Sequence, residues 1–416
     1  MKCRICGNGN TEMFLSLGMQ PHCNNFLRKE QVSKEILYPL DVYYCHGCSL
    51  VQIEYTVPKE VMFTDYPYVS GTTRTLPEHF RKSAERITGR FNLARNDLVV
   101  DIGSNDGTWL KCFKQLGVRA LGVEPAVNIA KIATSSGIET INDFFCKKIA
   151  LKILRDKGPA SVITAAGVFF HLEELHSVVD GISNLLDEDG ALVVQAIYLA
   201  EMIDKNSFDN IYHEHLCYYT LKPLQTLFDM YGMEIFDASV IDIHGGSLEL
   251  YVAKKGAYEV QPSVEQLMQK EKQKGLYDIA AYYAFAEQVR NIRKELLTIL
   301  NNVKEEGKTV YAYGAPAKGS TLVNYCGIGP NLVTCAIEKN PMKCGLYIPG
   351  VHIPIVPEEF AEKPDYYLIL PWNFLDEFLV KEKHFLQQGG KFIVPIPRPR
   401  IITGQRAVSR ASVNAK

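Results

Sequence analysis

Short apolar runs alternate with longer amphipathic segments between residues 96 and 200. Four of the runs have the length of buried strands, and they read LVVDIG, ALGVEP, SVITAAGVFF and ALVVQAIY. The segments between them carry apolar residues at the spacing of one helix face. Strands that alternate with helices in this way predict a parallel sheet with helices on both faces. We therefore expect a Rossmann-like α/β domain in this part of the chain.

A second alternation of the same kind starts near residue 307. Its apolar runs read KTVYAYGAPAKGS, LVTCAIE, DYYLILP and KFIVPIP, and they predict a second, smaller α/β domain. Residues 263–306 have a long helical pattern rich in Lys, Glu and Ala, which predicts a linker helix or a helical hairpin. Residues 74–95 predict a connecting helix. The polar tail of residues 401–416 is expected to fray.

The first 60 residues lack the periodicities of both helices and strands, which suggests an irregular, turn-rich structure. A chain of 416 residues is too long for one core, because single cores stop growing near ~250 to 300 residues. The patterns divide the chain into an N-terminal domain over residues 1–73, a central domain over residues 74–262 that includes the connecting helix, and a C-terminal domain over residues 263–416 that includes the linker helices.

Composition and charge limit the partners of the chain. Hydrophobic residues make up 47% and charged residues 22%, the mix of an ordinary globular protein. Lys+Arg 45 and Asp+Glu 47 nearly balance, so the chain lacks the positive charge that non-specific nucleic-acid or anionic-membrane binders need. No apolar stretch reaches the roughly 18 residues of a membrane helix, and the first residues lack the apolar core of a signal peptide. We expect a cytoplasmic protein and, by default, a monomer.

Two CxxC pairs in the N-terminal domain predict a metal site. The four cysteines are Cys3, Cys6, Cys45 and Cys48, and the total of 11 cysteines is odd, which argues against a disulfide framework. Each pair points two sulfurs at one ion, and two pairs give closed tetrahedral coordination of Zn²⁺. A closed site has no open position for substrate, so a structural zinc ribbon is favoured over nucleic-acid binding or catalysis.

The turn after the first apolar run predicts a cofactor site. Asp101 ends the run, and Gly103 and Gly107 frame a G-x-x-x-G turn. A dinucleotide fingerprint would read G-x-G-x-x-G, but Asn105 and Thr108 occupy the second and third glycine places. The turn therefore allows close approach without a diphosphate cradle, which favours an adenosyl ligand.

Two acidic residues further along the chain also favour an adenosyl ligand. Glu124 ends the second apolar run, where its carboxylate can accept hydrogen bonds from both ribose hydroxyls, and Asp143 is placed to meet an adenine amino group. Together these features favour S-adenosylmethionine (SAM) over NAD or a turn that binds no ligand.

Residues 209–216, DNIYHEHL, concentrate titratable groups after the predicted sheet. His213 and His215 are too close together for a zinc-protease H-E-x-x-H motif. His215 is a candidate general base, because imidazole titrates near neutral pH, with Glu214 and Tyr212 as groups that orient it or bind substrate. The alternative is a set of core polar residues, and the sequence does not separate a base from a ligand within this segment.

Further candidates flank this segment. His244 precedes two glycines, which let backbone amides approach a ligand, although a simple turn fits them equally well. Tyr66 and Tyr68 follow the predicted zinc ribbon and are candidates to cover the site from the other side, the alternative being ordinary aromatic packing.

Several blocks in this order resemble the three-domain SAM-dependent sugar C-methyltransferases, especially the 3-C-methyltransferases of dTDP-4-keto-deoxysugars. The resemblance covers nearly the whole chain. Besides the paired CxxC motif, its blocks are DIGSNDG, GVEPA, FDNIYHEHLCYYT, HGGSLELYVA, YGAPAKGSTLVNY, NPMKCGLYIPGVHIPI and LPWNF.

The resemblance implies methylation of the carbon beside a ketone, with His215 as the base and Tyr212, Glu214 and Tyr68 lining the sugar pocket. A proton next to a carbonyl is acidic enough for imidazole only if the enolate is stabilised, so the base has to be paired with a hydrogen-bond donor.

The same resemblance implies that the C-terminal domain binds the nucleotide of a nucleotide-sugar substrate. The glycine loop that carries Gly314, Lys318 and Gly319 suits a diphosphate, and Asn340 and Lys343 complete that site.

Two positions depart from the family pattern and leave the sugar and the methylated carbon open. Gly167 stands where the family commonly has asparagine, and residues 195–197, QAI, replace a Glu-Val-Pro-like triplet. Two other functions stay open at this point: methylation of a sugar hydroxyl oxygen, and a zinc- and SAM-binding protein without turnover.

Overall fold

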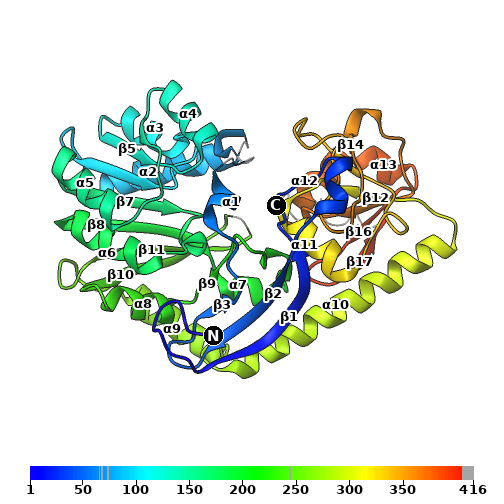
Figure 1. The fold of residues 1–416 in the computed structure, drawn as a ribbon, viewed down its shortest axis with the longest axis horizontal. Coiled ribbons are helices and arrows are strands. Elements are labelled where there is room, and N and C mark those ends of the chain that lie inside the picture. The colour runs from blue at the N-terminus through cyan, green and yellow to red at the C-terminus, as the bar shows by residue number, and fades with distance from the viewer. Residues whose placement is uncertain (65, 67–68, 73–74, 244, 405–416) are drawn as a thin grey trace.

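The computed structural model describes residues 1–64, 66, 69–72, 75–243 and 245–404. Tyr68 and His244, two of the candidates above, lie outside the described residues. The chain forms three units, each built on its own sheet (Figure 1). Of the helices in the described ranges, none combines the length and apolar character that a membrane span needs.

The N-terminal unit is built on a four-stranded sheet in the order β1-β2-β3-β9. Its strands are β1 (Thr11–Pro21), β2 (Leu37–Cys45), β3 (Val51–Ile53) and β9 (Cys217–Tyr218). The expectation of an irregular first 60 residues is wrong for β1 and β2, which form a long antiparallel hairpin. In β2 the buried Leu40, Val42 and Tyr44 alternate with more exposed residues, the period of a half-buried strand.

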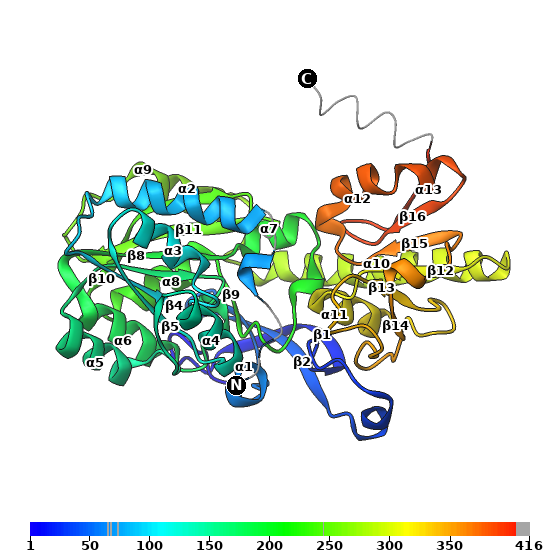
Figure 2. The same ribbon diagram turned by 90° about the horizontal axis from the view of Figure 1, so that it is seen from above.

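The fourth strand of this sheet comes from far along the chain. In β9, Tyr218 pairs with Val51 and Cys217 with Gln52 of β3. Since β9 directly follows the YHEH segment, this pairing fixes that segment against the N-terminal unit. The hairpin also reaches the C-terminal unit, where Leu27 forms a bridge with Tyr347 (Figure 2).

The central unit confirms the expected α/β fold. Its seven-stranded sheet has the order β10-β11-β8-β7-β4-β5-β6, and β4 to β8 are parallel. The strands are β4 (Leu98–Ile102), β5 (Arg119–Val123), β6 (Glu139–Ile141), β7 (Ala160–Ala166), β8 (Leu186–Ile197), β10 (Met233–Ile241) and β11 (Ser247–Lys254). The helices before and between them are α1 (Lys59–Phe63), α2 (Thr75–Arg90), α3 (Thr108–Gln115), α4 (Val127–Ser135), α5 (Lys147–Lys157), α6 (Leu175–Leu185), α7 (Leu199–Asp204) and α8 (Leu221–Asp229).

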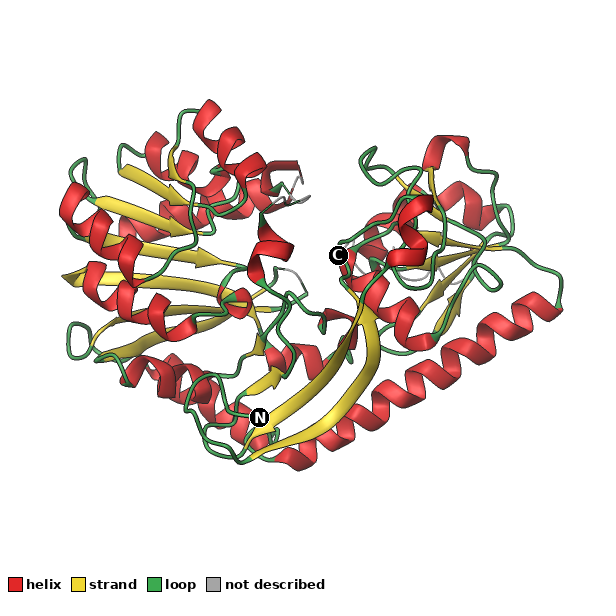
Figure 3. Cartoon of the chain, in the orientation of Figure 1, coloured by secondary structure: helices red, strands yellow, loops and turns green. Residues whose placement is uncertain are grey.

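The C-terminal unit is the smaller α/β sheet that the second alternation predicted. Figure 3 shows its strands with helices packed around them. The strand order is β14-β13-β12-β15-β16-β17, with β17 antiparallel to β16. The strands are β12 (Val310–Tyr313), β13 (Ala336–Glu338), β14 (Ile355–Pro357), β15 (Tyr366–Ile369), β16 (Lys391–Val394) and β17 (Arg400–Ile402), and the helices are α11 (Ala317–Cys326), α12 (Leu375–Lys381) and α13 (Lys383–Gln387). The expected fraying is wrong for residues 401 and 402, which are paired in β17.

Two helices join the α/β units, as the linker pattern predicted. They are α9 (Pro262–Gln273) and α10 (Ile279–Glu305), and α10 runs from beneath the hairpin to the C-terminal unit (Figure 1). The carboxylate of Glu271 on α9 is fully buried. It accepts hydrogen bonds from the backbone N–H of Leu221 at 3.0 Å and from the hydroxyls of Tyr198 at 2.9 Å and Tyr277 at 2.5 Å. This carboxylate therefore fixes the linker to the central unit.

Replacing Glu271 by alanine is expected to lower the free energy of unfolding by about 3 kcal/mol, because two buried donors and the half-buried hydroxyl of Tyr277 lose their acceptor. Chemical denaturation followed by circular dichroism measures the change. Glu265→Ala on the exposed face of the same helix is the control and should cost less than about 0.5 kcal/mol. Equal costs for the two variants would contradict the assigned role.

Candidate functional site

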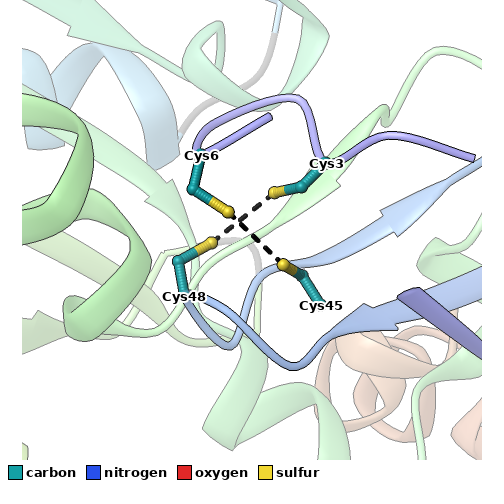
Figure 4. Close-up of side chains that lie close together, drawn as sticks. All are labelled: Cys3, Cys6, Cys45 and Cys48. Carbon is teal, nitrogen blue, oxygen red and sulfur yellow. Dashed lines mark hydrogen bonds between the residues drawn. The ribbon is translucent and has the colours of Figure 1, made fainter. Parts of the chain in front are cut away.

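The four cysteines of the CxxC pairs converge at the base of the hairpin (Figure 4). Their sulfur atoms all lie within 4.8 Å of one another, with Cys3 3.5 Å from Cys48 and Cys6 3.5 Å from Cys45. A tetrahedron of thiolates at ~2.3 Å from Zn²⁺ has edges of roughly 3.8 Å. The cluster therefore fits one zinc ion with little movement.

The acid-base properties of these thiols also fit a cation. The hydrogen bond with Cys48 lowers the pKa of Cys3 to about 5, whereas burial raises the pKa of Cys45 to about 11. Four thiolates so close together repel one another, so a bound cation is needed to keep them all deprotonated. With four ligands around it, zinc has no open position, and its role here is structural.

The glycine turn of the central unit lies between β4 and α3 and is shaped for close approach. Gly103, Asn105 and Gly107 all have positive φ, at 65°, 50° and 75°. A Cβ on Gly103 would lie 2.5 Å from Val168 Cγ2. The Ser104 hydroxyl has no hydrogen-bond partner among the described residues although it is buried. A turn with glycines at its two ends, beside a buried Ser104 hydroxyl that can still form a hydrogen bond, fits an adenosyl ligand.

The acidic candidates for the cofactor site have different surroundings. Glu124 follows β5, and its carboxylate accepts the backbone N–H groups of Asn105 at 2.9 Å and Ala126 at 2.8 Å. Burial raises the pKa of Asp101 to about 7, and its carboxyl accepts the hydroxyl of Thr164 at 2.7 Å. Asp143 is exposed and caps the backbone of the next residue. Glu124 thus stabilises the turn directly through hydrogen bonds, and Asp101 links β4, which leads into the turn, to β7.

The ring of His215 is enclosed by aromatic groups. Its centroid lies 3.8 Å from that of Tyr212, 4.5 Å from that of Phe170 and 5.1 Å from that of His171. Nδ1 of His215 donates to the carbonyl of Asn210 at 2.7 Å. In a neutral ring this hydrogen bond selects the tautomer with the lone pair on Nε2.

The carboxylate of Glu214 turns away from His215 and toward the hairpin. Oε1 accepts from Nε2 of His22 at 3.0 Å and from the amide of Asn24 at 2.6 Å, and Oε2 accepts from the hydroxyl of Tyr66 at 3.1 Å. Burial alone would raise the pKa of Glu214, but the hydrogen bond and charge of His22, the charge of His171 and the hydrogen bond of Asn24 lower it to about 2. Glu214 is therefore a buried anion held by donors from the N-terminal unit.

The other two members of the YHEH block have separate environments. His213 is fully buried, donates to the carbonyl of Pro39 at 3.2 Å, and has its pKa lowered to about 4 by burial. Burial and the neighbouring Glu214 raise the pKa of Tyr212 well above its ordinary value, so its hydroxyl stays protonated. The block thus divides into a packed imidazole, a protonated phenol, an anion and the imidazole of His215.

The segment after β7 links these residues to the cofactor turn. Val168 touches the turn at Gly103, and three residues later His171 packs against His215. Nδ1 of His171 donates to the carbonyl of Glu214 at 2.6 Å. Sequence reasoning missed His171, although a polar residue just past the end of a parallel strand was an available signal. It also missed His22 and Asn24, which are 192 and 190 residues away from Glu214 in the sequence.

The two departures from the family pattern lie together at the end of β8. The backbone N–H of Gly167 donates to the carbonyl of Gln195 at 2.8 Å. The Gln195 side chain accepts from His79 at 2.9 Å and donates to Glu249 at 2.8 Å. Glutamine can serve both partners because its amide offers an acceptor and a donor.

The C-terminal candidates surround the start of α11. Gly314 directly follows β12 and has φ 77°, and a Cβ on Gly319 would lie 3.0 Å from Leu370. Nζ of Lys318 donates to Asn373 at 2.5 Å and lies 4.0 Å from the buried carboxylate of Asp209, just before the YHEH block. This lysine therefore faces the central unit.

The two remaining C-terminal candidates lie on the loop after β13. Nζ of Lys343 donates to the carbonyl of Ala315 at 2.8 Å and lies 4.6 Å from the ring centroid of Phe26 in the hairpin. Asn340 caps its own loop by accepting the backbone N–H of Met342. The structure brings Lys318 and Lys343 toward the other units, whereas Asn340 holds its turn.

Family models match all three parts of the chain. They describe a zinc binding domain at residues 3–63, a methyltransferase domain at residues 73–238 and a C-methyltransferase C-terminal domain at residues 242–397. The chain is 38% identical over 408 residues to C-methyltransferase NovU of Streptomyces niveus, covering 97% of each protein. The chain belongs to the C-methyltransferase family. It is a SAM-dependent methyltransferase with a zinc-binding N-terminal unit.

Solved structures also resemble part of this C-methyltransferase. Magnesium protoporphyrin IX methyltransferase of Synechocystis PCC 6803 with bound SAH is 12% identical, with 43% of this chain and 83% of that chain covered at a TM-score of 0.34. A SAM dependent methyltransferase of Archaeoglobus fulgidus is 17% identical, with 43% and 94% covered and the same TM-score of 0.34.

In this C-methyltransferase, Cys48→Ala is expected to abolish tight zinc binding and to lower the free energy of unfolding by about 3 kcal/mol or more, because zinc binding energy is folding energy. Elemental analysis of dialysed protein and thermal unfolding measure the two effects. Cys112→Ala, a thiol outside the cluster, should retain zinc. A Cys48→Ala protein with full zinc content would contradict the four-cysteine site.

Gly103→Ala is expected to weaken SAM binding at least about tenfold, because the new methyl forces Val168 away from the turn and adds a strained positive φ. Isothermal titration calorimetry with SAM measures this. Gly117→Ala, at φ 84° in open space, is the matched control. It should cost about 1 kcal/mol of stability and leave SAM affinity unchanged. Equal affinities for the two variants would contradict the placement of the cofactor.

Proposed function

We propose that this protein methylates the carbon next to the ketone of a nucleotide-activated 4-keto-deoxysugar, at C3 of a dTDP-linked sugar, with His215 as the general base. The observation that carries the proposal is the hydrogen bond from Nδ1 of His215 to the carbonyl of Asn210. It puts the basic lone pair on Nε2 and holds the ring in one orientation.

The neighbours of His215 support this assignment by elimination. A carboxylate with a pKa of about 2, such as Glu214, is too weak a base for a carbon acid. Tyr212 is kept protonated by its raised pKa and suits a donor to the enolate oxygen. His213 is packed against the hairpin and donates to Pro39.

Proximity to the cofactor turn supports the same role. Val168 touches Gly103, and His171 in the same short segment packs on His215. A base and a methyl donor on either side of one substrate carbon is the arrangement that proton removal and in-line methyl transfer require.

The C-terminal unit supports a nucleotide-linked substrate. Lys318 lies in the first turn of α11, which follows β12, and Lys343 lies on the loop after β13. Both are near the carboxyl ends of parallel strands, the usual position of ligand sites in open α/β sheets. Burial lowers the pKa of each lysine, but nearby acidic groups oppose this effect. Two cations beside a glycine loop suit the diphosphate of a nucleotide sugar.

The proposed reaction has two steps. His215 Nε2 takes the proton from the carbon, and the C–H electron pair moves into an enolate whose oxygen accepts a hydrogen bond from Tyr212. SAM, when bound, supplies an electrophilic methyl group that the carbon takes up while the S–C electron pair leaves on sulfur. The hydrogen bond from Nδ1 of His215 to the carbonyl of Asn210 keeps the ring, and with it Nε2, in one orientation during both steps.

His215→Asn is expected to lower both methylation and deuterium exchange by about 10²- to 10⁴-fold, because both need the same proton transfer. The assays are mass spectrometry of dTDP-, GDP- and CDP-linked keto-sugars with SAM, and solvent deuterium uptake at the carbon beside the ketone without SAM. His176→Gln, whose imidazole hydrogen-bonds to the hydroxyl of Tyr231, serves as the control for loss of an imidazole.

If the wild-type protein methylates a sugar without deuterium uptake beside the ketone, carbon methylation is overturned in favour of oxygen methylation. Methylation of none of the sugars would overturn the substrate class, and full exchange in His215→Asn would overturn the choice of base.

A further inference from the structure

A second cluster of metal-ligating side chains lies where the hairpin meets the YHEH block. It consists of His22, Cys23 and Glu214, whose ligand atoms all lie within 4.8 Å of one another. It is separate from the four-cysteine cluster. β1 begins at Thr11, near the four cysteines, and ends at Pro21, next to His22. An extended strand of this length spans roughly 35 Å.

The spacing of the three atoms suits a small divalent ion. Oε1 of Glu214 is 3.0 Å from Nε2 of His22 and 3.7 Å from Sγ of Cys23. With ligand distances of ~2.0 Å for nitrogen and oxygen and ~2.3 Å for sulfur, tetrahedral edges are roughly 3.3 Å and 3.5 Å. An ion can therefore replace the hydrogen bonds of this cluster without moving the backbone.

The surroundings of the cluster resemble those of a metal site. The hydroxyl of Tyr66 and the amide of Asn24 hydrogen-bond to Glu214 and hold its orientation, as outer-shell groups do for ligating carboxylates. Cys23 is buried, but the side chain of His22 keeps 12% of its surface exposed, which gives an ion a route from solvent.

We propose that His22, Cys23 and Glu214 form a second divalent-metal site that takes a thiophilic ion of the Zn²⁺ class. Imidazole, thiolate and carboxylate together match such an ion and disfavour Mg²⁺ and Ca²⁺, which prefer oxygen ligands. Binding releases the proton of the Cys23 thiol and leaves a fourth coordination position for water. The bound ion replaces the hydrogen bond between His22 and Glu214.

A second consequence rests on the proposed function. Glu214 belongs to the proposed sugar pocket, so an ion that holds this carboxylate competes with substrate. Excess Zn²⁺ is then expected to inhibit methyl transfer reversibly, whereas the zinc of the four-cysteine cluster is needed for folding.

Titration with Co²⁺ tests the site in the full-length zinc-loaded protein without substrate. Zinc in the four-cysteine cluster has a filled d shell and is silent, so added Co²⁺ reports the second site alone. We expect a thiolate-to-cobalt charge-transfer band and tetrahedral d–d bands that saturate with one ion per chain. Elemental analysis run in parallel checks that the cluster zinc is retained.

Cys23→Ala should remove the charge-transfer band, and His22→Gln, which keeps a donor for Glu214, should weaken Co²⁺ binding at least about tenfold. Cys326→Ala is the matched control, because both thiols are 1% exposed. Absence of the band in wild type, or its survival in Cys23→Ala, would overturn the site. Co²⁺ binding without Zn²⁺ inhibition would leave the metal site standing and overturn only the part that rests on the proposed function.

Discussion

A buried carboxylate needs hydrogen-bond donors, and the donors that satisfy Glu214 come from the hairpin and from Tyr66 after it. Removing these donors would leave an uncompensated charge in the interior, which costs several kcal/mol. The N-terminal unit is therefore tied to the YHEH block by the same contacts that keep Glu214 ionised. Pairing of β9 with β3 adds a backbone ladder a few residues later.

This constraint gives the zinc cluster a mechanical role. Cys45 ends β2 and Cys48 lies in the turn before β3, so a bound ion fixes one end of the hairpin. The other end carries His22 and Asn24 to Glu214 and continues to the C-terminal unit, where Leu27 pairs with Tyr347. A metal far from the proposed reacting carbon can thus decide whether the pocket forms at all.

The three units meet through side chains as well as strands. Asp209, just before the YHEH block, accepts a hydrogen bond from the indole of Trp372 at 2.7 Å, and Lys318 lies 4.0 Å away. On the cofactor side, Asn128 of α4 exchanges hydrogen bonds with the backbone of Tyr66, whose hydroxyl reaches Glu214. The proposed sugar, nucleotide and SAM sites are therefore coupled through a few polar contacts.

Local patterns in the sequence were enough for the fold class, the cluster of four cysteines and the presence of a glycine turn after β4. Strand and helix periodicity, two CxxC pairs and the turn from Gly103 to Gly107 all act over a few residues, where spacing dictates geometry. The hairpin was missed because its alternation is interrupted by shifts in register at two points of β1.

Only the tertiary structure decided which way each side chain of the YHEH block points and which groups it contacts. The block has neither helical nor strand period, so spacing does not say which way each side chain points. Two of its directions are set by partners distant in sequence, Pro39 for His213 and His22 for Glu214. The ring of His215 is held by the nearby carbonyl of Asn210 and packs against the more distant His171. The contacts of Pro39 and His22 depend on the packing of the N-terminal unit against the central unit, which no local pattern encodes.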